Sequence, residues 1–191
     1  MKLSRDFYTR EDVLLIANEL LGKILFTKMD GKITAGIITE TEAYVGVNDR
    51  ASHAYNNRRT ARTEVMYAVG GTSYVYLCYG IHHLFNVVTN AENIPHAVLI
   101  RAIQPCKGVV TILRRRNKMK LYDKICNGPG TVSQALGITT SHTLQDLLGK
   151  SIWIEDQGIK VLEKDIIKSP RIGVDYAGAD ALLPYRFTVK I

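Results

Sequence analysis

Two acidic residues stand near the end of an apolar run of the sequence, in the segment ITETEAY, which contains Glu40 and Glu42. Side chains alternate between the two faces of a β-strand, so Glu40 and Glu42 are expected to share a face. Such a pair commonly forms a solvated strand edge. A carboxylate at the mouth of a cleft can instead take a proton from water as a general base. The spacing of the two residues leaves both interpretations open.

A second segment is rich in tyrosine and ends in a glycine turn. Tyr74 and Tyr76 are predicted to point to the same side of a strand, and Tyr79 lies just before Gly80 at its end. Aromatic side chains on strands most often pack in a core. In a basic protein their flat faces could instead stack on an unpaired nucleobase, an interaction worth ~1–3 kcal/mol per base. A bulky residue at a hairpin tip can also wedge into a base stack.

The charge of the chain favours a polyanionic partner. The 191 residues contain 25 Lys and Arg against 18 Asp and Glu, which gives a net charge of +7, and positive potential attracts phosphate backbones. Many small basic proteins bind no nucleic acid, so charge alone leaves this open. The three cysteines lack C-x-x-C spacing and the histidines lack metal-ligand spacing, which predicts no metal site. Neither a signal peptide nor an apolar run of roughly 18 residues is found, which predicts no membrane association.

The elements that must position these segments follow from hydrophobic periodicity and turn residues. Helical patterns are predicted over residues 13–21, 62–68, 109–118 and 131–136. Alternation predicts strands over residues 23–29, 32–44, 72–79, 84–90, 97–104, 151–155, 159–162 and 185–191. Thr9 is expected to cap the first helix, Asp30-Gly31 to form a hairpin turn, and residues 46–60 to form a long loop.

The order of these elements predicts the fold class. Strands in a hairpin series flanked by helices are typical of an α+β fold. No repeat, low-complexity linker or domain boundary interrupts the sequence. Residues 1–191 are therefore expected to form a single compact domain with a curved, largely antiparallel β-sheet flanked by helices.

Taken in order, the segments of this chain resemble the alkyladenine (3-methyladenine) DNA glycosylase family. The resemblance is carried by LLGKIL, ITETEAYVG, DRASHA, GTSYVYLCYGIHHLFNVV, AVLIRAIQP, CNGPGTVSQALGI, IWIED and RIGVDYAG. These segments cover nearly the whole chain, and ETEAY followed by YVYLCYG and VLIRA at these spacings is highly specific. The sequence departs from the family at His82, where some members carry a tyrosine, and many members continue past the position of Ile191.

The resemblance implies an enzyme of base excision repair. It would be a monofunctional DNA glycosylase that flips alkylated or deaminated purines out of duplex DNA and hydrolyses the N-glycosidic bond. The expected lesions are 3-methyladenine, 7-methylguanine, hypoxanthine and ethenoadenine. The implied partner is double-stranded DNA containing a damaged purine, bound by a monomer with no metal or organic cofactor. The expected location is that of the DNA: the cytoplasm, with the nucleoid, in a bacterium, or the nucleus in a eukaryote.

The same resemblance implies three catalytic roles. Glu42 matches the general base that activates the water attacking C1′ of the damaged nucleotide, and its charge would stabilise an oxocarbenium-like transition state. Arg101 matches an arginine that helps to position this water, and the backbone carbonyl of Ile172 matches a further contact to it. Neither ETEAY nor YVYLCYG contains a lysine, which favours a water mechanism without a Schiff base or a strand-cleaving step.

Five further residues match positions that bind the base or the duplex. Tyr44 and His53 match residues that line one side of the flipped base, and Tyr76 matches the ring stacked on its other face. His53 would also hydrogen-bond the purine edge. Asn86 matches a residue that crowds the 2-amino group of guanine and so excludes the normal base. Tyr79 matches the side chain that fills the gap left in the duplex.

Two alternative functions remain open on the sequence. The first is a non-catalytic nucleic-acid-binding module that uses only the tyrosine and arginine clusters. The second is a different hydrolase on the same fold, which acts on a free nucleoside or an RNA base. The basic residues from Arg114 to Lys118 either contact phosphate or form a solvated helix face.

Overall fold

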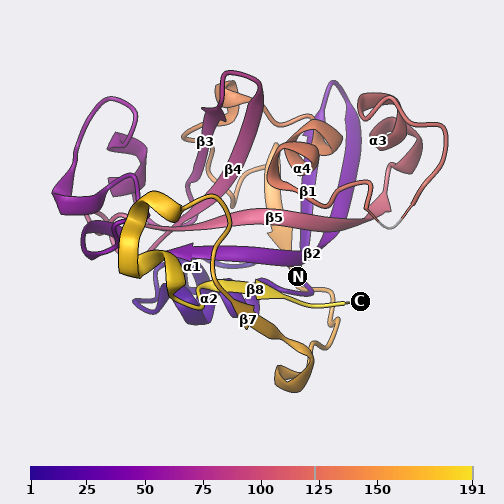
Figure 1. Ribbon diagram of the computed structural model, residues 1–191. Coiled ribbons are helices and arrows are strands. Elements are labelled where there is room, and N and C mark those ends of the chain that lie inside the picture. The colour runs from indigo at the N-terminus through magenta and orange to yellow at the C-terminus, as the bar shows by residue number, and fades with distance from the viewer. Residues whose placement is uncertain (123, 191) are drawn as a thin grey trace.

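The two longest strands, β2 (Lys32–Tyr44) and β5 (His96–Lys107), lie side by side and antiparallel in the middle of one sheet (Figure 1). The computed structural model describes residues 1–122 and 124–190. The other strands are β1 (Ile24–Met29), β3 (Ser73–Cys78), β4 (His82–Thr89), β6 (Ile152–Glu155), β7 (Ile167–Ser169) and β8 (Arg186–Thr188). Within the described residues the sheet has eight strands: six follow the order β3-β4-β5-β2-β1-β6, and β8 pairs with both β2 and β7.

The strand β2 changes its neighbour along its length, which curls the sheet. β5 covers one edge of β2, while on the other edge β1 pairs with residues Lys32–Ile37 and β8 with Glu40–Glu42. The register with β5 is irregular between Ala35 and Gly36 and on both sides of Glu40, and such bulges increase local twist. The result is a curved antiparallel half-barrel with helices packed on it, so the predicted α+β class is confirmed.

Helices lie on the sheet and complete its apolar core. They are α1 (Arg5–Tyr8), α2 (Val13–Glu19), α3 (Val109–Arg115) and α4 (Pro129–Leu136). Figure 1 shows α2 below β2 and α4 above β5. Ile16 of α2, Val132 of α4 and Ile100 of β5 are fully buried in the same core. None of the helices in the described part of the chain is long and apolar enough to cross a membrane.

The predicted cap of the first long helix is wrong. The carboxylate of Asp12, not the hydroxyl of Thr9, accepts hydrogen bonds from the N–H groups of Leu14 and Leu15, at 2.9 and 3.0 Å. Thr9 instead ends α1, where its hydroxyl donates to the carbonyl of Arg5 at 3.2 Å. The short helix α1 precedes the amphipathic helix α2, so two helices begin in this part of the chain where the sequence predicted one.

Two further predictions need correction. Residues 159–162 form no strand, because they have no strand neighbour; Val161 only packs its side chain onto the core. The strand lies later, at β7. The segment predicted as a helix over residues 62–68 is a shorter 3₁₀ helix, Glu64–Tyr67. The long loop is present and contains two short 3₁₀ helices, Gly46–Asn48 and Tyr55–Asn57. The last residue of the strand predicted over 185–191 lies outside the described residues.

Candidate active site

A row of side chains crosses four strands at one level of the sheet. Glu42 of β2 lies opposite Leu99 of β5, which lies opposite Asn86 of β4. Asn86 in turn lies opposite Tyr74 of β3. Opposed residues of antiparallel strands point to the same face. The register therefore collects on one face residues from four separate parts of the sequence.

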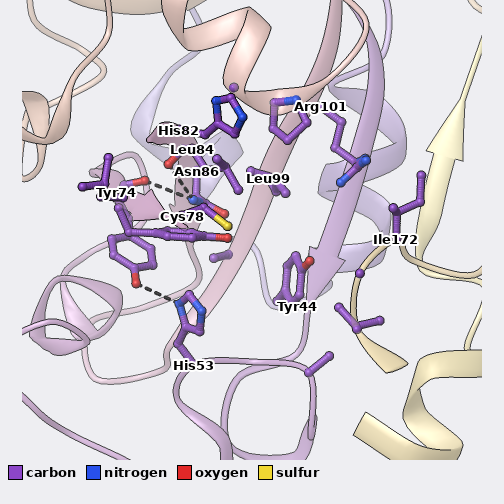
Figure 2. A pocket seen from close by; sticks show the side chains of 18 of the residues that line it. Tyr44, His53, Tyr74, Cys78, His82, Leu84, Asn86, Leu99, Arg101 and Ile172 are labelled. Atoms are coloured by element: carbon purple, nitrogen blue, oxygen red, sulfur yellow. Dashed lines mark hydrogen bonds between the residues drawn. The ribbon is translucent and has the colours of Figure 1, made fainter. Parts of the chain in front are cut away.

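This face forms the floor of a pocket of about 600 Å³, a volume typical of small-molecule sites. Figure 2 shows Tyr44 and Ile172 on one side of the pocket and His53 and Tyr74 on the other. Glu42 is fully buried and adjoins the pocket through Tyr44, Arg101 and Ile172, which contact it and line the pocket. All the other residues assigned from the sequence line the pocket: Tyr44, His53, Tyr76, Tyr79, Asn86, Arg101 and Ile172.

Three donors hold the carboxylate of Glu42. Its Oε1 accepts a hydrogen bond from the backbone N–H of Ile172 at 2.7 Å. Its Oε2 accepts from the hydroxyl of Tyr44 at 2.9 Å and from Nη1 of Arg101 at 3.3 Å. Burial raises the pKa of Glu42 above its usual range, and the three donors only partly offset this effect. The pocket therefore adjoins a carboxylate that is more basic than an exposed one, as general-base chemistry requires.

The two acids of β2 share a face, as the alternation of side chains predicted. Oε1 of Glu40 accepts a hydrogen bond from Nε of Arg101 at 2.9 Å, while Glu42 accepts from Nη1 of the same guanidinium. Glu40 lies opposite Ala102 and Thr41 opposite Ile100, so the register of β2 and β5 skips Arg101. This bulge places Arg101 between the two carboxylates. Both acids are buried, so the interpretation as a solvated strand edge is wrong.

An aromatic wall surrounds the ring of His53. Nδ1 of His53 lies 2.9 Å from the hydroxyl of Tyr74, and the ring packs edge-on against Tyr76 with centroids 4.7 Å apart. Burial, together with the charges of Arg62 and Arg58, lowers the pKa of His53 to about 4. The imidazole is therefore neutral at neutral pH and offers one donor and one acceptor. The resemblance implied no role for Tyr74, although the alternation of side chains placed it on the same side of the strand as Tyr76.

The backbone contacts of Asn86 and Ile172 fix their orientation. The amide nitrogen of Asn86 donates to the carbonyls of Tyr74 and Leu84, both at 3.2 Å, which locks the side chain in the pocket floor. Ile172 meets Glu42 through its N–H rather than its carbonyl. The predicted contact of Asn86 with guanine and that of the Ile172 carbonyl with water both stay predictions.

Tyr79 occupies the tip of the β3–β4 hairpin. The residue is 88% exposed, and both Tyr79 and Gly80 have positive φ angles, 51° and 73°. Positive φ at two central residues is the mark of a tight hairpin turn that matches the twist of its strands. The turn thus presents a large aromatic side chain to solvent at the rim of the pocket, and its insertion into DNA stays a prediction.

A buried ion pair beside the site was not predicted from the sequence. Nη1 and Nη2 of Arg171 contact the carboxylate of Asp49 at 2.5 and 2.9 Å, and Arg171 also donates to the carbonyl of Ala43 at 3.0 Å. The pair joins the loop that carries His53 to the segment that carries Ile172. Asp49 and Arg171 are far apart in the sequence, and no spacing pattern relates them.

Metal ligands do not gather in the part of the chain that the structure describes: no group of three or more His, Cys, Asp or Glu side chains could hold an ion there. The prediction that the chemistry needs no metal or organic cofactor stays a prediction. The site as built offers one basic carboxylate, one buried arginine and an aromatic pocket. This combination suits acid–base chemistry on a flat aromatic substrate.

Known proteins match the chain over its whole length. The family model of methylpurine-DNA glycosylase (MPG) matches residues 6–191. A protein of Chlamydia felis is 50% identical over 99% of this chain and 96% of its own length. Proteins of Clostridium acetobutylicum and Bdellovibrio bacteriovorus are 41% and 42% identical over 100% of this chain and 95% and 96% of their own lengths. All three relatives are named "Putative 3-methyladenine DNA glycosylase". The chain belongs to the methylpurine-DNA glycosylase family.

Proposed function

We propose that this protein is a monofunctional 3-methyladenine DNA glycosylase, which flips a damaged purine out of duplex DNA and hydrolyses its N-glycosidic bond. The observation that carries the proposal is the buried carboxylate of Glu42, held by three donors beside an aromatic pocket. The family and the names of its relatives support a DNA substrate. The substrates are 3-methyladenine, 7-methylguanine, hypoxanthine and ethenoadenine.

In this reaction Glu42 takes the proton of a water molecule that attacks C1′ of the damaged nucleotide. The contact between Arg101 and Glu42 is the longest of the three around the carboxylate, at 3.3 Å. We place the attacking water between these two groups. The ionised carboxylate stabilises the positive charge that develops on the sugar as the C1′–N bond breaks and the purine leaves with its electron pair. It accepts the proton of the water, which Arg101 orients, as the bond from the water oxygen to C1′ forms.

The pocket wall suits a cationic leaving group. Alkylation at N3 or N7 gives the purine a positive charge, which the faces of Tyr44 and Tyr76 attract. Because the pKa of His53 is lowered to about 4, this ring carries no charge at neutral pH that would repel the alkylated base. His53 can then hydrogen-bond the purine edge.

The direct test is base release from duplex oligonucleotides with one 3-methyladenine, hypoxanthine or ethenoadenine. We expect a free base and an intact abasic strand, because no lysine lies near Glu42 in ETEAY. A hydrolase of free nucleosides would act equally well on the matching nucleoside, and a binding module would retain the duplex without releasing any base. Either result would overturn the proposal.

Replacement of Tyr44 by phenylalanine is expected to move the acid limb of the pH–rate profile to higher pH. The hydroxyl of Tyr44 donates to Glu42 and lowers the pKa of this carboxyl against the larger effect of burial. Without the donor the pKa rises further, so more of the base is protonated at a given pH. Single-turnover base release between pH 4 and 8 measures the shift. Tyr76→Phe, which keeps all donors to Glu42, is the matched control, and equal shifts in both variants would contradict this role.

Replacement of Tyr79 by serine is expected to weaken binding of a lesion-containing duplex by about tenfold, because one stacking contact of ~1–3 kcal/mol is lost. Tyr79 is 88% exposed, so the melting temperature should stay unchanged. Fluorescence anisotropy with an uncleavable lesion analogue measures the affinity. Leu162→Ser changes another exposed apolar residue outside the pocket, and the wedge role fails if both variants bind as the wild type does.

The site also bears on the assembly and location of the protein. We infer that the protein acts as a monomer on one lesion at a time, because one copy of the chain supplies three donors to the carboxylate of Glu42. We infer that the protein works where its duplex substrate lies, which in bacteria such as those of its relatives is the cytoplasm with the nucleoid. Light scattering of the free protein and of its DNA complex tests the monomeric state.

A further inference from the structure

A second acid, Glu40, and a second arginine, Arg186, are linked by hydrogen bonds to the groups that contact Glu42. Oε1 of Glu40 accepts hydrogen bonds from Nε of Arg101 at 2.9 Å and from Nη1 of Arg186 at 3.1 Å. Arg186 lies opposite Glu42 in the register of β2 and β8. Its Nε donates in turn to the carbonyl of Pro170 at 3.1 Å. Glu40 thus connects an arginine of β5 to an arginine of β8 through a single oxygen atom.

These contacts close into a ring. Two residues after Pro170, the N–H of Ile172 donates to one oxygen of Glu42, and Arg101 donates to the other. We call this closed set of contacts the Glu40 ring; its members are Glu40, Glu42, Arg101, Pro170, Ile172 and Arg186. The side chains of Glu40, Glu42 and Arg101 are 8%, 0% and 11% exposed, so solvent screens their charges little.

We propose that Glu40 and Arg186 are positioning residues for base hydrolysis: they hold Arg101 and the segment 170–172 in the places where Glu42 needs them. This inference rests on the proposed function of Glu42 as the general base. Without Glu40, Nε of Arg101 loses its partner and the guanidinium can rotate onto Glu42 alone. Without Arg186, the carbonyl of Pro170 loses this donor. The segment 170–172 is then held less firmly, and with it the N–H of Ile172 that contacts Glu42.

Glu40 also acts on Glu42 through its charge. Burial is the largest cause of the raised pKa of Glu42; Arg101, the N–H of Ile172 and the hydroxyl of Tyr44 lower it, and the nearby charge of Glu40 raises it. The carboxylates of Glu40 and Glu42 share the single positive charge of Arg101. Within the ring, the charge of Glu40 therefore partly opposes the lowering of the pKa of Glu42 by Arg101 and Ile172.

Two substitutions separate these effects. Because both arginines contact the same oxygen of Glu40, Glu40→Gln can keep both hydrogen bonds through its amide oxygen while it removes the charge. Glu40→Ala removes the charge and both contacts. Glu19 is the matched control, since its carboxylate also pairs with an arginine, Arg10, but lies on α2 and outside the pocket.

The first measurement is the pH profile of single-turnover base release. Glu40→Gln should keep the plateau rate and move the acid limb to lower pH, because Glu42 loses a repulsive neighbour. Glu40→Ala should lower the plateau by roughly tenfold to hundredfold, the usual effect of misplaced groups. A plateau rate for Glu40→Ala that coincides with that of the wild type and of Glu19→Ala would overturn the proposal.

The second measurement does not depend on activity. Amide hydrogen exchange by NMR reports the bond between the N–H of Ile172 and Glu42. Glu40→Ala and Arg186→Ala should both speed exchange at Ile172 more than at Val98 in the centre of β5, whereas Glu40→Gln should not. Equal acceleration of hydrogen exchange at both amides would show general destabilisation and would overturn the proposed role of the Glu40 ring. A wild type that releases no base would overturn the proposed function instead, and the exchange data would still decide whether the ring positions Ile172.

Discussion

Replacement of Glu42 by glutamine is expected to slow base release by about 10²- to 10⁴-fold, the usual contribution of a general base. An amide has nearly the shape of the carboxylate but cannot take a proton from water at neutral pH. Binding of a lesion-containing duplex should persist, because Glu42 lies behind the residues that line the pocket. Rapid-quench base release and anisotropy on the same duplex measure the two effects separately.

The substitution also changes the hydrogen bonding of the site. Glutamine has one acceptor oxygen, whereas Glu42 accepts from the N–H of Ile172 at one oxygen and from two side chains at the other. The NH₂ end of the glutamine amide must therefore face a donor, which destabilises the fold. The substitution also removes a buried charge, which offsets this cost, so we expect only a small change in melting temperature. Glu40→Gln is the matched control on the same face and should retain its plateau rate. A comparable loss of base-release rate in Glu42→Gln and Glu40→Gln would contradict a role for Glu42 that differs from that of Glu40.

Replacement of Asp49 by alanine is expected to lower the free energy of unfolding by about 3–5 kcal/mol, the usual cost of removing one partner of a buried ion pair. The side chains of Arg171 and Asp49 are 0% and 2% exposed, and the guanidinium packs 4.8 and 5.2 Å from the ring centres of Tyr44 and Tyr185. Urea denaturation followed by circular dichroism measures the change.

Two comparisons make this result specific to the buried pair. Glu64→Ala removes one partner of the exposed pair between Arg59 and Glu64 and should leave the stability almost unchanged, because exposed pairs contribute little. The double variant Asp49→Ala/Arg171→Met should regain part of the loss, since it leaves no unpaired charge in the interior. If Asp49→Ala unfolds at the same urea concentration as Glu64→Ala, the pair does not stabilise the fold.

Local patterns in the sequence determined most of the elements and one part of the site. Alternation predicted the length of β2 and the common face of Glu40 and Glu42, and the Asp30-Gly31 turn joins β1 to β2 as expected. These features depend only on neighbouring residues. Two of the predictions that failed, the Thr9 cap and the strand over 159–162, required knowing what lies next to the segment. Asp12 offered an equally good cap by composition, and an apolar run forms a strand only where another strand edge is free.

The chemistry of Glu42 was decided by contacts between distant segments. Its basicity comes from complete burial, its donors come from β2, β5 and the segment after β7, and Arg101 reaches it because the register of β2 and β5 skips one residue. Residue spacing indicates which side chains share a face, but the pairing of remote strands and its bulges depend on how the whole core packs. The sequence by itself therefore determined the family, the fold class and the acid proposed as the general base. Only the tertiary structure decided how that acid is buried, the ring that holds it and the ion pair of Asp49 and Arg171 beside it, because burial and register are properties of the assembled sheet.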